Sequence, residues 1–171
     1  MNTTVVSKSR SNAHPDADAV QRQIASRSFC TMATVSQTGI PHATGVIYAY
    51  VDGVFYVSTL RTSRKARNLA ESGRASLCIP VRRVPAGPPS TVQVATSGEI
   101  LDQDDPRIVS LVGRGALKAI TGHGELEIAN GCFLRLTPRR RVQTYGLGLP
   151  LRTLIRDPLN ASGRVELPCA S

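Results

Sequence analysis

Cationic and hydroxyl side chains gather where a β-rich run gives way to a helical one, at residues 61–67. The cations are Arg61, Arg64, Lys65 and Arg67. The only acid of the expected helix, Glu71, stands near its end, which is the reverse of what the helix dipole favours. This arrangement costs stability unless an anion binds. With the free amides of the first turn and the hydroxyls of Thr62 and Ser63, the segment predicts a phosphate site, and a solvated basic helix is the alternative.

A β-hairpin must position this segment. Alternating and β-branched residues predict strands at 29–35, 42–51 and 54–59, and the dipeptide Asp52-Gly53 predicts a tight turn between the last two. Counting back from that two-residue turn places Val46 opposite Thr59 and Thr44 opposite Arg61. Further strands are expected at 75–81, 91–101, 132–137 and 141–145.

Helical patterns flank these strands. Helices are expected at 15–27 and at 62–72, where Gly73 suits the end of the second one. A third, interrupted by glycines, is expected to begin at Pro106. The glycine-rich stretch 121–131 and the triplet 139–141 read as loop and turn. This order predicts a mainly β fold, a six-stranded antiparallel split β-barrel with two or three flanking helices.

Three parts of unequal size are expected along the chain. Residues 1–13 read as a disordered leader, 14–148 as the barrel domain, and 149–171 as a tail with one helical turn that packs on the barrel or on a dimer partner. At 171 residues the chain suffices for one compact domain.

The composition is that of a globular protein with a large positive charge. Hydrophobic residues make up 41% and charged residues 19%, and the formal net charge is +9. That charge comes from 18 arginines against 3 lysines. Arginine excess reflects either a GC-rich genome or an anionic ligand, because guanidinium binds phosphate and carboxylate in two-pronged geometry. With 4% aromatic residues, little is left for stacking bases, so nucleic-acid binding is the weaker reading of the charge.

The spacing of the cysteines and histidines predicts no metal site, and the lengths of the apolar runs predict no membrane segment. The four cysteines form no C-x-x-C pair and read as buried hydrophobes of a reduced compartment. His14, His42 and His123 have no spacing that would let them share a metal. Without a signal-peptide stretch or a span of about 18 apolar residues, a cytoplasmic protein is expected.

The order of motifs resembles the FMN-binding split barrel of the pyridoxamine-phosphate-oxidase-like superfamily. The resemblance rests on the runs Val54-Phe55-Tyr56-Val57-Ser58-Thr59, Thr62-Ser63-Arg64-Lys65-Ala66-Arg67-Asn68-Leu69 and Arg74-Ala75-Ser76-Leu77, and it covers about residues 16–145. In that superfamily the Ser-Arg-Lys turn grips the phosphate of the cofactor. The resemblance therefore implies a flavin or deazaflavin at this turn and a homodimer whose sites are built from two chains.

The resemblance also implies roles for single residues. Arg64 and Lys65 would bind phosphate, Ser63 and Thr59 would donate hydroxyl hydrogen bonds, and Arg67 would add charge. The expected cofactor set is completed by Val46, Ile47 and Tyr48, whose backbone would line the ring edge, by Ser58 and Arg61, and by Gln93, which would reach a cofactor held mainly by the partner subunit. His42 and Tyr145 are weak candidates for orienting or protonating a substrate.

Two functions remain open on this fold. The first is a flavin- or deazaflavin-dependent oxidoreductase, with FMN or factor 420 as cofactor and a small organic substrate. The second is a protein that binds flavin, deazaflavin or haem without turnover. Arg135-Leu136-Thr137-Pro138 resembles the tail of true pyridoxamine-phosphate oxidases, but 33 residues follow it, which argues against vitamin-B6 chemistry.

Overall fold

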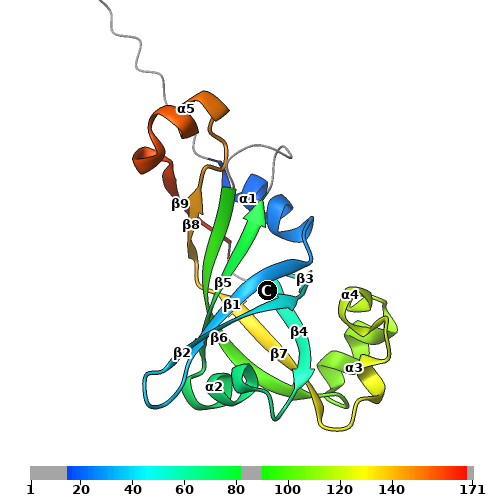
Figure 1. Ribbon diagram of the computed structural model, residues 1–171. Coiled ribbons are helices and arrows are strands. Elements are labelled where there is room, and N and C mark those ends of the chain that lie inside the picture. Colours follow the sequence, from blue (N-terminus) through cyan, green and yellow to red (C-terminus); the bar gives the residue numbers. More distant parts are fainter. Residues whose placement is uncertain (1–14, 82–89, 169–171) are drawn as a thin grey trace, which may run out of the picture.

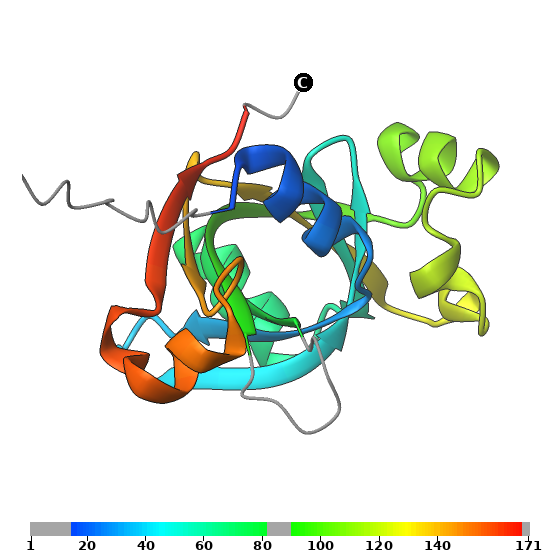
Figure 2. The same ribbon diagram turned by 90° about the horizontal axis from the view of Figure 1, so that it is seen from above.

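A curled antiparallel sheet forms the body of the protein. The computed structural model describes residues 15–81 and 90–168, and within them nine strands join one sheet. The strands are β1 (Phe29–Val35), β2 (Pro41–Ile47), β3 (Ala49–Val51), β4 (Val54–Leu60), β5 (Arg74–Val81), β6 (Ser90–Asp102), β7 (Gly131–Pro138), β8 (Arg141–Tyr145) and β9 (Ser162–Glu166). Seen along its axis the sheet closes on itself around a central core (Figure 2). The predicted split β-barrel class is confirmed, with more strands than the six expected.

The long strand β6 is the spine of the barrel. The sheet order is β2-β1-β5-β6-β7-β4-β3, with β8 on β6 and β9 on β8. Strands β7 and β8 follow one another along the same edge of β6. Between the pairs Thr96–Pro138 and Gln93–Gln143, β6 has two residues where the other strand has four. The strand β7–β8 therefore has two extra residues here, a bulge in a continuing strand, where a turn was expected at 139–141.

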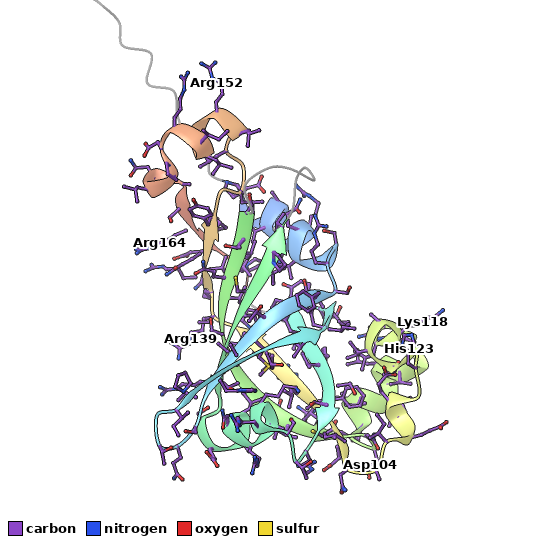
Figure 3. All side chains as sticks on the ribbon, viewed as in Figure 1. Asp104, Lys118, His123, Arg139, Arg152 and Arg164 are labelled. Carbon is purple, nitrogen blue, oxygen red and sulfur yellow. The ribbon has the colours of Figure 1, made fainter. Side chains whose placement is uncertain are left out.

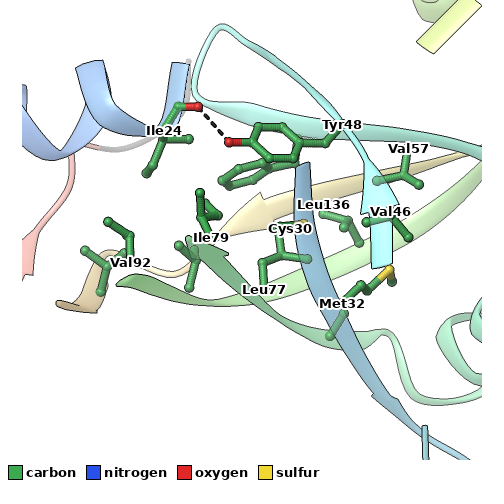
Figure 4. Close-up of a cluster of buried hydrophobic side chains, with 14 of the residues drawn as sticks. Ile24, Cys30, Met32, Val46, Tyr48, Val57, Leu77, Ile79, Val92 and Leu136 are labelled. Atoms are coloured by element: carbon green, nitrogen blue, oxygen red, sulfur yellow. Dashed lines mark hydrogen bonds between the residues drawn. The ribbon is translucent and has the colours of Figure 1, made fainter. Parts of the chain in front are cut away.

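The barrel is filled by aliphatic side chains with two aromatic rings among them. Strand β1 alternates exposed and buried residues, as expected of a strand with one face on a core. Figure 4 shows the resulting cluster, in which Tyr48 and Phe55 meet edge to face with 5.2 Å between ring centroids. The Tyr48 hydroxyl, buried in this core, donates a hydrogen bond of 2.7 Å to the Ile24 carbonyl, which satisfies the polar end of the ring.

Two helices lie at opposite ends of the barrel (Figure 1). Helix α1 (Ala17–Ala25) begins at Asp16, whose carboxylate accepts the Ala19 N–H, and it buries Val20 and Ile24. Helix α2 (Arg64–Ser72) packs on β1, β2 and β6 and ends at Gly73, which has the left-handed φ of 62° that favours glycine. Both expected helices are therefore present, with slightly shorter bounds than predicted.

A third helical region covers β3 and β4 from outside. Helix α3 (Pro106–Gly113) has Asp105 as its N-cap, and α4 (Lys118–Thr121) follows after the glycine interruption that the sequence indicates. The 3₁₀ helix η1 (Glu125–Glu127) then leads into β7. This region has a small core of its own, in which Leu117 and Phe133 are fully buried.

The expected hairpin is only partly formed. The single strand predicted at 42–51 is broken at Tyr48, and only Ala49–Val51 pairs with β4. Val46 pairs with Cys30 and Thr59 with Cys132, so the predicted Val46–Thr59 pair is wrong. The predicted Thr44–Arg61 pair is wrong too, since Thr44 pairs with Met32. At the break the Tyr48 N–H donates to the Ser28 carbonyl at 2.7 Å, next to β1, and the chain then turns from β1 towards β4.

The tail contributes a strand that its sequence did not predict. After α5 (Leu151–Arg156) and the 3₁₀ helix η2 (Pro158–Asn160), β9 pairs with β8 over five residues and brings Val165 and Leu167 into the barrel core. In the described part of the chain, the helices are too short or too polar to cross a membrane.

Candidate functional site

The amino end of α2 is built by two hydroxyl side chains. Ser63 is the N-cap, and its Oγ accepts the Ala66 N–H at 3.3 Å. Thr59, at the end of β4, donates its hydroxyl to the same Oγ at 3.3 Å. The two residues predicted as hydroxyl donors thus form one hydrogen-bonded pair at the helix start, and their first task is to fix the turn from β4 into α2.

Lys65 faces a pocket between β2 and β4. The pocket measures about 240 Å³ and is lined by Gly45, Val46, Ile47, Ser58, Lys65, Ala119, Ile120, His123 and Glu125. It lies between β2 and β4, which do not pair because the hairpin is broken at Tyr48. The broken hairpin therefore creates the space. Four predicted site residues meet here: Val46, Ile47, Ser58 and Lys65. The pocket offers a cation, a hydroxyl and strand backbone along one wall, and the apolar side of α4 along another.

Arg64 and Arg67 open on a different hollow. It measures about 340 Å³ and is lined by Ser36, Thr38, Ile40, Arg64, Arg67, Asn68 and Glu71. Glu71 accepts the Gln37 N–H at 3.1 Å, and the Asn68 amide donates to Thr34 at 3.0 Å, so these contacts tie α2 to the β1–β2 turn. Among the described residues neither arginine has an ion-pair partner. The basic side chains at 64–67 therefore diverge to two sides of the helix.

Arg61 is neutralised by a carboxylate. Its guanidinium is paired with Asp102 at the end of β6. Of the four cations at this helix start, Arg64, Lys65 and Arg67 have no such partner among the described residues, which corrects the expectation that four uncompensated cations crowd this helix. Arg135, the first residue of the Arg-Leu-Thr-Pro motif, also has an ion-pair partner. Its guanidinium lies 3.0 Å from the carboxylate of Glu99 on β6.

Gln93 and Tyr145 lie together, far from Lys65 within one chain. They share a hollow of about 630 Å³ on β6, β8 and β9, lined by Gln93, Gln143, Thr144, Tyr145, Ser162, Gly163 and Arg164. Figure 3 shows Arg164 and His123, one from each hollow, on opposite sides of the barrel. One chain therefore does not bring the predicted site residues into one cavity. Those that line a hollow form three separate groups: one at Lys65, one at Arg64 and Arg67, and one at Gln93 and Tyr145.

Five predicted residues line none of these three hollows: His42, Tyr48, Thr59, Arg61 and Ser63. His42 lies on β2 opposite Thr34, half-buried, outside the residues that line the described pockets. Tyr48 is buried with its hydroxyl on Ile24, and burial raises the pKa of that hydroxyl. Tyr48 can therefore offer only its backbone to a ligand, as the prediction assumed, and it has no acid–base role.

His123 and Glu125 are pocket residues that the sequence prediction missed. Both line the Lys65 pocket, although they stand almost sixty residues from Lys65 in a stretch read only as loop. The hydrogen bond from the His123 N–H holds the pKa of the Glu125 carboxyl below its usual range, so this wall carries a negative charge near neutral pH. The motif Gly122-His123-Gly124 was the available signal, because glycines on both sides expose an imidazole.

Two of the described cysteines, Cys30 and Cys132, are buried and are poor nucleophiles. Burial, with a smaller contribution from Cys78, raises the pKa of the Cys30 thiol to about 12. Burial also raises the pKa of Cys132. Within 15–81 and 90–168, no group of three or more His, Cys, Asp or Glu residues is placed to hold a metal ion. His14 and Cys169 lie outside the described residues.

Barrel, broken hairpin and basic helix start together define a class of split-barrel proteins with a pocket at the start of a basic helix. A family model described as pyridoxamine 5'-phosphate oxidase matches residues 17–143. That match covers most of the chain, and the protein belongs to this family. No curated protein matches the sequence.

Solved structures share the fold at low sequence identity. A haem-binding protein from Mycobacterium smegmatis superposes with a TM-score of 0.67 at 20% identity, over 90% of this chain and 62% of that one. An FAD-binding protein from Mesorhizobium loti gives 0.61 at 18%, over 76% and 92%. An F420 reductase gives 0.50 at 17%, over 70% and 92%. The chain thus spans less than two thirds of the first of these proteins, and such likeness shows the fold alone.

Proposed function

We propose that this protein is a flavin- or deazaflavin-dependent oxidoreductase that acts on a small organic substrate as a homodimer in the cytoplasm. The observation that carries the proposal is the Lys65 pocket, in which a cation, a hydroxyl and strand backbone lie beside the amino end of α2. Membership of the pyridoxamine 5'-phosphate oxidase family supports it.

Phosphate is the ligand group that the pocket residues fit best. The Ser58 hydroxyl and the Lys65 ammonium can both donate hydrogen bonds, and a helix amino end favours negative charge. Val46 and Ile47 would contact the cofactor ring through the β2 backbone. A bound flavin or deazaflavin would supply the redox chemistry, while these residues would bind and orient it and α4 would exclude water. FMN and factor 420 both carry the required phosphate.

The homodimer is proposed from the outer face of β1 and β2 and from the separation of the two hollows. Phe29 is 50% exposed and Ile47 is 56% exposed, and both face outward from paired positions of these strands. The Phe29 ring lies over Gly45, where a Cβ would approach it to 2.9 Å. An apolar face next to the pocket suits a subunit interface. Across it, Gln93 and Tyr145 of one chain would complete the pocket of the other.

Binding without turnover is the second candidate. It is favoured by the structural likeness to a protein named for haem binding, and by the lack of a catalytic acid or base among the predicted site residues that share the Lys65 pocket. Haem would use the same space, with its carboxylates near Lys65. The spectrum of the purified protein separates the candidates: absorbance near 450 nm indicates flavin, a Soret band indicates haem, and a colourless protein indicates a weakly held or lost deazaflavin.

The direct test removes the two cations that the resemblance assigns to the phosphate, Lys65 in the pocket and Arg64 on the neighbouring hollow. Replacing Arg64 and Lys65 together by alanine should weaken FMN and factor 420 binding by about 1.5 to 3 kcal/mol for each charged hydrogen bond lost, measured by fluorescence titration. The matched control replaces Arg152 and Arg156 of α5, which removes the same charge away from the pocket. Equal affinity in the two double variants would disprove the phosphate assignment.

A further inference from the structure

The Lys65 pocket is lined by a second side chain with a nitrogen group, that of His123. His123 lies between α4 and η1, and both His123 and Lys65 line the same cavity. Figure 3 shows His123 at the edge of the α3–α4 region, beside Lys118. The His123 side chain is 88% exposed, so its ring is available to a bound molecule. Of the two histidines that the structure describes, only this one borders the pocket.

The loop that carries His123 is held in place by hydrogen bonds. The Gln103 carboxamide donates to the carbonyls of Glu125 and Ile128, at 3.1 and 3.3 Å, which fixes η1 against the end of β6. Gly124 has a φ of 88°, which favours glycine and turns the chain back. The Glu125 carboxylate then accepts the His123 N–H at 2.7 Å. The imidazole therefore projects from a fixed backbone.

Glu125 also orients the ring. Its second carboxylate oxygen lies 3.7 Å from Nδ1 of His123, so that nitrogen faces the acid and Nε2 faces away from it. A carboxylate on one ring nitrogen is the arrangement by which proteins set a histidine to bind through the other.

The remaining charges around His123 leave room for an anion. Lys118 lies on α4, Glu127 on η1, and Lys65 across the pocket on α2. In the β3–β4 turn, Asp52 is paired with Arg114 at 2.7 Å, so it does not balance these cations. A protonated His123 and Lys65 would repel one another across an empty pocket, whereas an oxyanion between them would attract both.

We propose that His123, oriented by Glu125, is an oxyanion-binding residue of the Lys65 pocket and makes anion binding there depend on pH. It donates from Nε2 to the oxyanion that Lys65 binds from the other side. This proposal rests on the proposed function only for the identity of the anion. The oxyanion is the phosphate of a cofactor or a free anion of the same chemistry, and the experiment separates these sources.

Sulfate is the probe, because its charge is constant between pH 5.5 and 8. Sulfate titrations followed by the His Cε1–H resonances should give binding about tenfold tighter at pH 5.5 than at pH 8, since a charge-assisted hydrogen bond is lost as the imidazolium deprotonates. His123→Gln should bind sulfate with the same affinity at both pH values. His42→Gln is the matched control and should behave as the wild type.

Further variants and ligands test the same claim. Glu125→Gln should reduce the pH dependence, and Lys65→Ala should weaken sulfate binding at both pH values. Titrations with FMN and factor 420 test whether the oxyanion is the phosphate of a cofactor. If the affinity for the cofactor depends on pH and His123→Gln removes this dependence, the cofactor phosphate binds at His123. If neither cofactor binds while sulfate binding keeps its His123-dependent pH response, the cofactor assignment fails and the His123 assignment stands. A pH response that survives His123→Gln would overturn the proposal.

Discussion

The Lys65 pocket and the Gln93 hollow differ in charge and in origin. The pocket beside Lys65 has charged walls, with an ammonium on α2 and a carboxylate on η1, and it arises where β2 separates from β4. The hollow beside Gln93 is lined by two amides, hydroxyls and one guanidinium, on neighbouring strands in regular register. The first therefore offers a ligand one cation and one carboxylate, and the second offers one cation among neutral hydrogen-bonding groups.

This difference explains how the two regions depend on the rest of the chain. The positions of Ser63 and Lys65 follow from one short helix start, so they survive changes elsewhere in the barrel. The Gln93 hollow needs β9, whose residues come from the end of the chain and pair with β8. We expect damage to the tail to affect the Gln93 hollow first.

The largest expected effect is on stability, through the tail. Leu167 is 3% exposed and its N–H donates to the Arg140 carbonyl, so Leu167→Ala should lower the free energy of unfolding by about 2 to 5 kcal/mol. Leu159 is 91% exposed, and Leu159→Ala should leave stability unchanged. Urea denaturation of both variants measures the difference. Equal midpoints would show that the tail does not support the barrel.

A mixing experiment tests whether the two regions meet across a dimer. Lys65→Ala and Gln93→Ala should each weaken cofactor binding, Lys65→Ala more, because a charged hydrogen bond contributes more than a neutral one. Refolding the two variants together should restore about a quarter of the wild-type high-affinity sites, since half of the dimers are mixed and each has one intact site. Counting sites by fluorescence titration gives the result, and no recovery would place each site within one chain.

The helix start offers a smaller, local test. Ser63→Ala removes the cap on the Ala66 N–H and should lower the free energy of unfolding by about 1 kcal/mol, and it should also weaken phosphate binding at the Lys65 pocket. Ser63→Thr keeps the hydroxyl and should restore most of the loss. Thermal unfolding with and without FMN separates the two contributions. A loss of stability without any change in FMN affinity would assign Ser63 to the fold alone.

The smallest expected effect is a loss of folding stability at low pH when Glu125 becomes protonated. The pKa of this carboxyl is lowered by the His123 N–H, so its stabilising contribution is present above the ordinary pKa of glutamate, about 4.3, and is lost as pH falls through the folded-state pKa. Glu125→Gln should therefore narrow the stability difference between pH 6 and pH 3. Glu127→Gln, on the same 3₁₀ helix, should not change it, and identical curves for all three proteins would remove Glu125 from this role.

Local patterns predicted much of the fold. The Asp52-Gly53 turn, the Asp105 cap with Pro106 after it, and the Gly73 stop all depend on neighbouring residues, and all are present. The failures came from long-range contacts. Nothing near Tyr48 in the sequence indicates that its N–H and hydroxyl bind the carbonyls of Ser28 and Ile24 and so break the strand. The same holds for Arg61, whose partner Asp102 comes from β6.

By itself the sequence determined which elements form and that one helix start carries cations that an anion would stabilise, because capping, periodicity and helix charge are properties of a few adjacent residues. Only the tertiary structure decided which of those cations share a cavity, that Glu125 and His123 face Lys65, and that β9 joins the sheet. These outcomes depend on contacts between residues far apart in the chain, which are set when the strands pair and the core packs.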